Sequence, residues 1–376
     1  MADRRSFRRK SRKAPCILIV DDKIEDADAT RLLFSRSVAT IPKTPDEVTV
    51  GDLERADLAL VDQVLDEWRF DRPNVAEHPK DGVALSSVLR SHCARDRPTA
   101  FALLTGELDG LSRGLPPRCH LHQIARANNV EWVFSKNPSE NDLPVSTQAL
   151  SLEAAMRALP RIWPRNQPYK MRGILERLLA LPPSNWRERA WRYVEACHPP
   201  IHELAPPTHA VNFVRWMLHS ILPYSTFLWD FRYLAARLRV TQRSLNQVLH
   251  ADGSFVRRLK PFRYHGLLHE FLGGRWWRPG IESWLWELTE ARPFDVRVLE
   301  NVVRRWSPQL EVVSLNQPVV AFDRDLRATD EFIEMSEAEE LQPDDWPAFA
   351  DRPYALHDIV MSEERLESVL SKNSEA

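Results

Sequence analysis

The chain has 376 residues, enough for two domains, and its 43% hydrophobic and 28% charged residues are those of an ordinary globular protein. No apolar run approaches the length of a membrane span, and no apolar segment follows the basic N-terminus as it would in a secretory signal. Four widely spaced cysteines without a CxxC pair exclude a disulfide or zinc framework and indicate reduced thiols. We therefore expect a cytoplasmic protein that does not enter a membrane.

Charge is distributed unevenly along the chain. Residues 1–13 carry seven Arg or Lys and one Asp, residues 157–320 carry 24 Arg or Lys and 13 acids, and residues 323–376 carry 5 Arg or Lys and 16 acids. One interpretation is three differently solvated surfaces. The other is a basic surface for an acidic partner, for which the acidic C-terminal segment competes.

Strand and helix patterns alternate through the first third of the chain. Short apolar runs predict strands, and apolar residues at helical spacing predict helices between them. The expected strands are residues 16–20, 56–62, 99–106 and 130–136, with another near 47–50; the expected helices are residues 24–38, 81–94 and 121–128. This alternation predicts an α/β fold, a doubly wound parallel five-stranded sheet covered by helices on both faces.

The rest of the chain has a different composition. A polar, turn-rich stretch, "SKNPSENDLPVSTQAL", precedes a region with ten of the thirteen tryptophans and frequent prolines, which predicts many short helices. The stretch "LEVVSLNQPVVAF" predicts a hairpin around "NQP", and the acidic C-terminal segment retains helical periodicity. The expected organisation is a basic flexible tail (1–14), an α/β domain (15–145), a mostly α-helical Trp-rich domain (150–322) and an acidic segment with a terminal helix (323–376).

Polar side chains stand at the carboxyl end of each main predicted strand. They are Asp21, Asp22, Asp62, Thr105 and Lys136. Such ends line one crevice in an open parallel sheet. Three carboxylates there can bind Mg²⁺, one can act as a nucleophile toward phosphorus, and a lysine and a hydroxyl can bind phosphoryl oxygens.

These motifs resemble the receiver domain of two-component response regulators over roughly residues 15–140. "LIVDD", "DLALVD", "DGVALSSVLR", "ALLTG" and "FSKNP" follow one another in the order of that family. The resemblance implies phosphorylation of Asp62, Mg²⁺ bound by Asp21, Asp22 and Asp62, a switch hydroxyl at Thr105 and a phosphate-binding Lys136. It also implies a sensor histidine kinase or another phosphodonor as partner, and phosphorelay signal transduction as the process.

The sequence also departs from that family. About ten residues are inserted between Asp62 and the Asp81-Gly82 pair, the usual Met-Pro is missing, and Asn137 separates Lys136 from Pro138. These departures favour an alternative, in which the chain is a non-phosphorylated receiver-like scaffold or adaptor in a multiprotein complex.

The helical region contains one candidate nucleic-acid motif. "DFRYLAARLRVTQRSLNQVLHAD" has the apolar spacing of a helix-turn-helix, with Thr241 as the expected cap of the second helix. Its exposed face is expected to present residues that contact phosphates and base edges, aided by a later arginine: Arg243, Ser244, Asn246, Gln247 and Arg258. The alternative is an ordinary amphipathic helix pair in the core.

No nucleotide-binding glycine loop, Ser/His/Asp set or catalytic cysteine signature is evident, so we do not expect an enzyme. "YHGLLHE" and "CHLH" have histidine spacings that bind zinc, but packed histidines explain them as well. The sequence thus predicts a signalling protein whose receiver-like domain controls a helical region that binds a protein or DNA.

Overall fold

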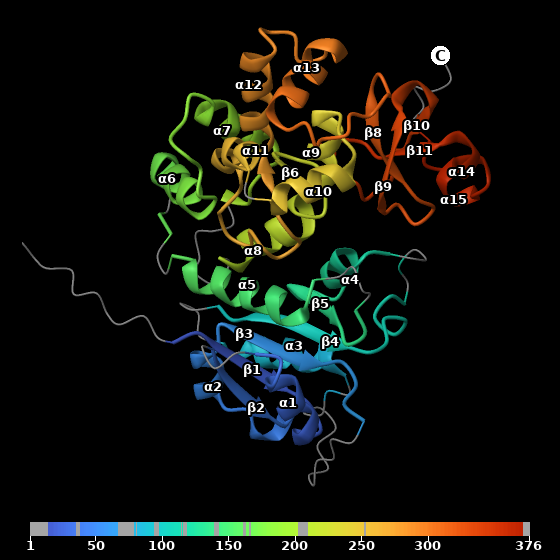
Figure 1. The fold of residues 1–376 in the computed structure, drawn as a ribbon. Coiled ribbons are helices and arrows are strands. Elements are labelled where there is room, and N and C mark those ends of the chain that lie inside the picture. The colour runs from blue at the N-terminus through green and yellow to red at the C-terminus, as the bar shows by residue number, and fades with distance from the viewer. Residues whose placement is uncertain are drawn as a thin grey trace, which may run out of the picture.

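The computed structural model describes residues 14–34, 38–66, 79, 81–93, 98–113, 115, 119–138, 143–160, 163–164, 167–201, 210–251 and 253–370. The expected basic tail, except for Ala14, and most of the insertion after Asp62 lie outside these residues. In Figure 1 a layered α/β part, a helical part and a small C-terminal sheet follow one another along the chain.

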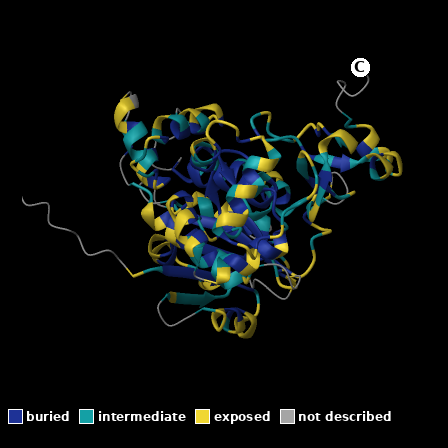
Figure 2. Cartoon of the chain, turned by 45° about the horizontal axis from the view of Figure 1, so that its top comes forward, coloured by how far each residue is buried: buried dark blue, intermediate teal, exposed yellow. Residues whose placement is uncertain are grey.

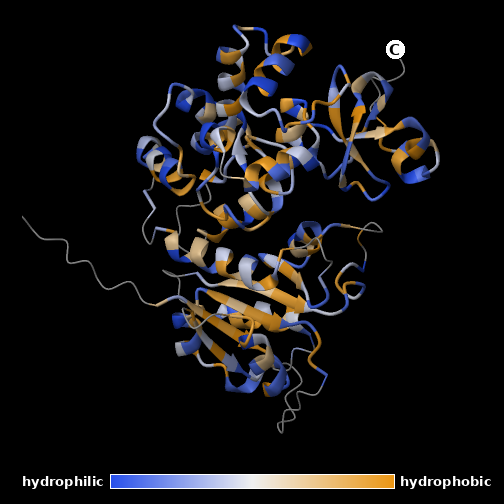
Figure 3. Ribbon diagram, viewed as in Figure 1, coloured by the Kyte–Doolittle hydropathy of each residue, from blue (hydrophilic) through white to orange (hydrophobic). Residues whose placement is uncertain are grey.

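A five-stranded parallel sheet forms the first part. Its strands are β1 (Cys16–Val20), β2 (Ala39–Lys43), β3 (Leu58–Asp62), β4 (Ala100–Thr105) and β5 (Trp132–Ser135), in the order β2-β1-β3-β4-β5. This is the doubly wound order of flavodoxin-like folds, so the predicted fold class is confirmed. Four of the strands are almost entirely apolar, as Figure 3 shows by their colour, which is typical of strands buried on both faces.

The strand expected near residues 47–50 was wrong, because β2 forms earlier in the chain. Thr49 instead caps a helix: its side chain accepts from the N–H of Asp52, whose carboxylate accepts from the N–H of Thr49. β2 lies at the edge of the sheet, where Pro42 within it is tolerated.

Helices cover both faces of this sheet. They are α1 (Ile24–Arg31), α2 (Val50–Arg55), α3 (Gly82–Ser91), α4 (Leu121–Ala127) and α5 (Val145–Ala158). Alternate strand residues point to opposite faces. Ile17 and Leu60 belong to the core that contains α5, whereas Leu18 and Val61 belong to the core that contains α3.

The helical part packs directly on the α5 side of the sheet. Its elements are α6 (Pro168–Leu178), α7 (Arg187–Ala196), α8 (Val211–Trp216) with a π-helical turn (Met217–Ile221), β6 (Leu228–Trp229), α9 (Phe231–Leu238), α10 (Gln242–His250), α11 (Ser254–Leu259), β7 (Trp276–Trp277), α12 (Arg278–Leu288) and α13 (Val296–Trp306). One continuous core joins both parts: Trp132 of β5 meets Phe271 edge-to-face, 4.9 Å between ring centroids. Figure 2 shows buried residues running through both.

A small sheet follows in the acidic segment. It contains β8 (Pro318–Phe322), β9 (Ala328–Glu334), β10 (Ala338–Glu340) and β11 (Tyr354–Leu356) in the order β10-β11-β8-β9, followed by α14 (His357–Met361) and α15 (Glu364–Glu367). The expected boundary at residues 322 and 323 therefore lies inside the β8-β9 hairpin. Two short helices stand where one terminal helix was expected.

The hairpin predicted around "NQP" was wrong. β8 pairs with β9, which follows it, while Val312 forms an isolated bridge with Val240. The run before "NQP" is thus engaged with the turn between α9 and α10 and is not free to pair with β8. Among the described residues, no helix combines the length and apolarity needed to cross a membrane.

Candidate functional site

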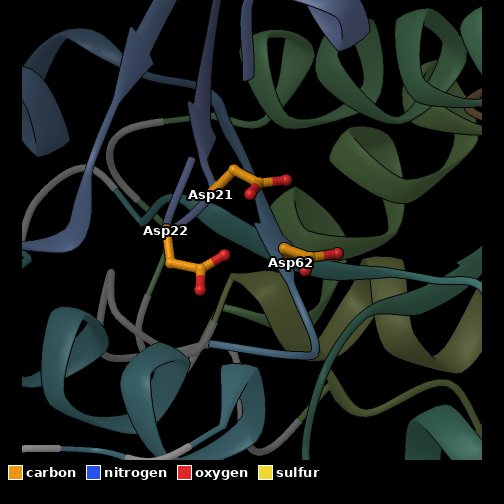
Figure 4. Close-up of side chains that lie close together, drawn as sticks. All are labelled: Asp21, Asp22 and Asp62. Carbon is orange, nitrogen blue, oxygen red and sulfur yellow. The ribbon is translucent and has the colours of Figure 1, made fainter. Parts of the chain in front are cut away.

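Three carboxylates meet at the carboxyl end of the parallel sheet. Asp21 and Asp22 directly follow β1, and Asp62 is the last residue of the neighbouring strand β3. One carboxylate oxygen from each lies within 4.8 Å of the others, and Figure 4 shows the three side chains beside one another. Asp21 and Asp62 are buried, and Asp22 is half-buried.

Lys136 forms ion pairs with this cluster. Its Nζ lies 2.6 Å from Oδ1 of Asp62 and 3.9 Å from Oδ2 of Asp21. It follows β5, and its backbone N–H donates to the carbonyl of Thr105 at the end of β4, 2.7 Å away. Adjacent parallel strands thus bring together residues more than 70 positions apart, as their strand-end positions predict.

The pKa values of two of these carboxylates are raised. Burial raises the pKa of Asp21 to about 6, the charge of Asp62 adds to this rise, and the hydrogen bond from the N–H of Lys23 opposes it. Burial also raises the pKa of Asp62, against the hydrogen bond and charge of Lys136. A cation bound here would lower the cost of keeping these two buried carboxylates charged.

The donor set fits a hard divalent cation. It contains only carboxylate oxygens on two adjacent strand ends, the ligand type that Mg²⁺ prefers. Asp21, Asp22 and Asp62 would hold it. This is the set predicted as metal ligands from the sequence.

Thr105 stands near the cluster but is turned to its own loop. It is almost fully buried, and its Oγ1 donates to the carbonyl of Glu107 (2.7 Å) and accepts from the N–H of Glu107 (3.0 Å). No hydrogen bond joins its hydroxyl to Asp62 or Lys136 in the described part of the chain. Reaching a group on Asp62 requires breaking this local turn.

Gly82 holds α3 against the backbone of Asp62. A Cβ on Gly82 would lie 2.2 Å from the carbonyl oxygen of Asp62, so only glycine fits without a shift. The preceding Asp81 caps α3 by accepting from the N–H of Ala84 at 2.8 Å, and it bridges to Val64. The Asp81-Gly82 pair thus fixes the backbone next to the expected acceptor.

The candidate DNA-contacting residues have mixed positions. Arg243, Asn246 and Gln247 are exposed along α10, and Thr241 caps this helix as expected, accepting from the N–H of Ser244. The expectation that Ser244 is exposed was wrong: it is buried, and its Oγ donates to the carbonyl of Thr241 and accepts from the N–H of Glu311. Its hydroxyl thus holds the segment around Glu311 against the start of α10.

The same segment explains why Arg239 replaces the usual glycine of such a turn. Arg239 has a left-handed backbone (φ 57°), and its guanidinium donates to the carbonyls of Leu315 and Asn316. Arg258 is exposed on α11 and stacks over Trp306 at 5.3 Å. The arginines at 243 and 258 thus remain available to a partner.

One polar cluster was missed by sequence reasoning. Glu131, fully buried just before β5, is bound by Arg90 of α3 at 2.9 Å and by Arg215 of α8 at 2.7 Å. It also accepts from the N–H of Phe101, and the side chain of His219 contacts its carbonyl at 2.9 Å. The partners stand 30 to 88 positions away, so no local sequence signal identified them.

Comparisons with known proteins add little to this geometry. No family model and no curated protein matches the chain. One similar solved structure contains two RcsB dimers bound to two parallel DNAs: it is 11% identical, covers 54% of this chain and 98% of that chain, and has a TM-score of 0.25. Another is RcsB from Salmonella enterica serovar Typhimurium bound to promoter P1flhDC in the presence of phosphomimetic BeF3-. It is 14% identical, the match covers 55% of this chain and 91% of that chain, and the TM-score is 0.25. TM-scores this low carry no inference, and the five-stranded parallel sheet with its strand-end cluster remains the basis for function.

Proposed function

We propose that this chain is a receiver-like signalling protein in which Asp62 accepts a phosphoryl group with the help of Mg²⁺ and thereby controls the helical part. The observation that carries the proposal is the cluster itself. Three carboxylates lie within 4.8 Å of one another, and the Nζ of Lys136 lies 2.6 Å from Asp62. Burial raises the pKa of Asp21 and of Asp62, so a bound cation would favour the charged form of both carboxylates.

The chemistry follows from the positions of the side chains. An Oδ of Asp62 attacks the phosphorus of a phosphodonor, either a phosphohistidine of a sensor histidine kinase or an acyl phosphate such as acetyl phosphate. A new P–O bond forms as the bond from phosphorus to the leaving imidazole or acetate breaks. A bound Mg²⁺ would neutralise charge on the phosphoryl oxygens. Lys136 moves from the carboxylate of Asp62 to a phosphoryl oxygen.

Signal output then depends on Thr105. Its hydroxyl leaves Glu107 to bind the phosphoryl group, which rearranges the loop after β4. Lys136 and Thr105 are already joined through the backbone. The helical part packs against β5 and α5, next to these strand ends, so a change there reaches the partner-binding part through direct contacts.

Mass spectrometry after incubation with acetyl phosphate and Mg²⁺ tests the acceptor. We expect one added phosphoryl mass on the wild type, none on Asp62→Asn, and an unchanged yield on Asp66→Asn, a matched change at an exposed aspartate. Beryllofluoride with Mg²⁺ should occupy the same site. Unmodified wild-type protein, with no Mg²⁺-dependent change in stability, would leave the receiver-like scaffold or adaptor as the function.

The partner of the helical part is the second question, and DNA is the first candidate because Arg243 and Arg258 are exposed. Duplex binding should weaken steeply with salt, and changing both arginines to alanine should reduce the salt slope by about two. Arg297→Ala, an exposed arginine of α13, is the control. Absence of duplex binding at low salt would rule out DNA and leave a protein as the leading candidate.

A further inference from the structure

A cavity of about 770 Å³ lies where the helical part meets the small C-terminal sheet. Its walls come from α9, the loop before α13, the start of β8 and the chain leading into β11. Figure 1 shows α9 and β8 side by side in this region. The cavity is far in sequence from the strand-end cluster and shares no residue with it.

Arg237 of α9 is the most unusual residue of this wall. Its guanidinium lies over the ring of Phe294, 4.5 Å from the centroid. No carboxylate or hydrogen-bond acceptor pairs with it among the described residues. It is half-buried, and this burial lowers its pKa. A partly desolvated guanidinium without a counter-ion is expected to attract an anion.

Other donors on the wall are also unmatched. In the part of the chain that the structure describes, the buried Nε of Arg239 and the buried Nε1 of Trp229 have no acceptor. Arg352, a third arginine on the wall, has no ion pair with any described residue. The wall therefore has an excess of positive charge and of hydrogen-bond donors.

The nearby carboxylates do not neutralise these arginines, because each already has partners. Asp351, on the wall, is bound by Arg278 at 2.7 Å and by the hydroxyl of Ser225 at 2.6 Å. Glu334 accepts from the backbone N–H groups of Asn316 and Gln317. Glu282 binds Arg278 and Arg189.

The apolar part of the wall favours a flat ring. Phe294 is 79% exposed although it is large and apolar. The guanidinium of Arg237 lies over its ring. Tyr233, Tyr354 and Met335 line the same cavity, and Met335 is 40% exposed. Aromatic and thioether side chains beside a few polar groups are typical of small-molecule sites of this volume.

We propose that this cavity binds a small planar anion, an aromatic ring that carries a carboxylate or phosphate group. The anionic group pairs with Arg237, and the ring packs on Phe294 between α9 and the C-terminal sheet. A ligand there contacts both parts and stabilises their junction. The site is independent of phosphorylation at Asp62 and adds a second input to the proposed signalling function.

Calorimetric titration of the full chain with phenyl phosphate and benzoate, without Mg²⁺, tests this proposal. At least one should bind ten times more tightly than inorganic phosphate, which lacks the ring, and than benzamide, which lacks the charge. Comparison of the two ligands distinguishes a phosphate from a carboxylate. Repeating the titration with Asp62→Asn should give the same affinities, which separates this site from the strand-end cluster.

Two variants locate the binding. Arg237→Gln should weaken binding at least tenfold, and Arg297→Gln, the same change at an exposed arginine of α13, should leave it unchanged. Phe294→Ala removes an exposed ring, so the fold should tolerate it. It should weaken binding of whichever aromatic anion the wild type binds more than binding of inorganic phosphate. Wild-type affinity in Arg237→Gln or in Phe294→Ala, or no binding of either aromatic anion by the wild type, would overturn the proposal.

Discussion

Two buried acidic sites in the same sheet differ in how their charge is balanced. At the carboxyl end, two of three clustered carboxylates, those of Asp21 and Asp62, lie 3.9 and 2.6 Å from the Nζ of Lys136. Before β5, a single carboxylate, that of Glu131, binds two arginines. Burial raises the pKa of Asp21, whereas Arg90 and Arg215 overcome the burial of Glu131 and hold its pKa below the usual value.

The two sites have different roles: Glu131 stabilises the fold, whereas the strand-end cluster can bind a ligand. A buried charge with sufficient partners holds elements together, and Glu131 joins α3, β5 and α8 across the boundary between the α/β and helical parts. Buried like charges that lie close together repel one another, and a ligand of opposite charge can relieve this repulsion. The strand-end cluster belongs to the second kind, and so, with the opposite sign, does the arginine-lined cavity.

Replacing Glu131 should have the largest effect on stability. Glu131→Leu removes the carboxylate that Arg90, Arg215 and the N–H of Phe101 share, and we expect the free energy of unfolding to fall by about 3 kcal/mol. Urea unfolding measures this change. Glu195→Leu, at an exposed glutamate of α7, is the control. A loss below about 1 kcal/mol would show that Glu131 does not stabilise the packing of the helical part on the α/β part.

Gly82→Ala should lower both the stability of the fold and its response to Mg²⁺. Its Cβ would meet the carbonyl oxygen of Asp62, so α3 or the strand end must shift, at a cost of about 2 kcal/mol. Because Asp62 moves with its backbone, the stabilisation by Mg²⁺ should also decrease although no ligand is removed. Gly110→Ala, where a Cβ meets nothing within 4 Å, is the control. If Mg²⁺ stabilised Gly82→Ala as much as the wild type, the backbone position of Asp62 would not affect metal binding.

Mg²⁺ itself should stabilise the protein. At one hundred times its dissociation constant, a ligand that binds only the folded state adds about 2.7 kcal/mol, which raises the melting temperature by several degrees. Asp22→Asn should reduce this rise while sparing the fold, and Asp26→Asn, an exposed aspartate of α1, should not. Equal stabilisation of the wild type and Asp22→Asn would remove Asp22 from the ligand set.

The sheet was predictable from the sequence because its signals are local. Each buried strand is a short apolar run that ends in a polar residue, and parallel strands place these residues together without further information. The strand at β2 was misplaced because Pro42 and polar residues obscure its pattern. The hairpin around "NQP" was misplaced because its first half is recruited by the turn at Arg239, a contact between distant segments.

The remaining features depend on contacts between distant segments as well. Nothing around Glu131 indicates that arginines of α3 and α8 will meet it. Ser244 looked exposed because only the spacing of α10 was visible, not the segment at Glu311 that covers it. Arg237 and Phe294 stand 57 positions apart, and their cavity exists only once β8 packs on α9.

The smallest expected effect, a response to pH, has opposite signs at the two acidic sites. The pKa of Asp21 is about 6 in the folded protein, above the unfolded value of about 3.9, so protonation favours the folded state as pH falls through 6. Glu131, with its lowered pKa, loses stabilising charge only below the unfolded value of about 4.3. The interval from pH 7 to 5 therefore reports on the strand-end cluster and not on Glu131.

Histidines whose pKa is lowered in the folded protein affect stability in this interval with the opposite sign. Burial lowers the pKa of His120, His122 and His219, so protonation of the unfolded chain lowers stability as pH falls. Asp21→Asn keeps these histidines and serves as the reference. Relative to that variant, the unfolding free energy of the wild type should rise by about 1 kcal/mol from pH 7 to 5. Saturating Mg²⁺ should abolish the rise, since it competes with the proton. A pH-independent difference between the two proteins would mean that the pKa of Asp21 is not raised in the folded protein.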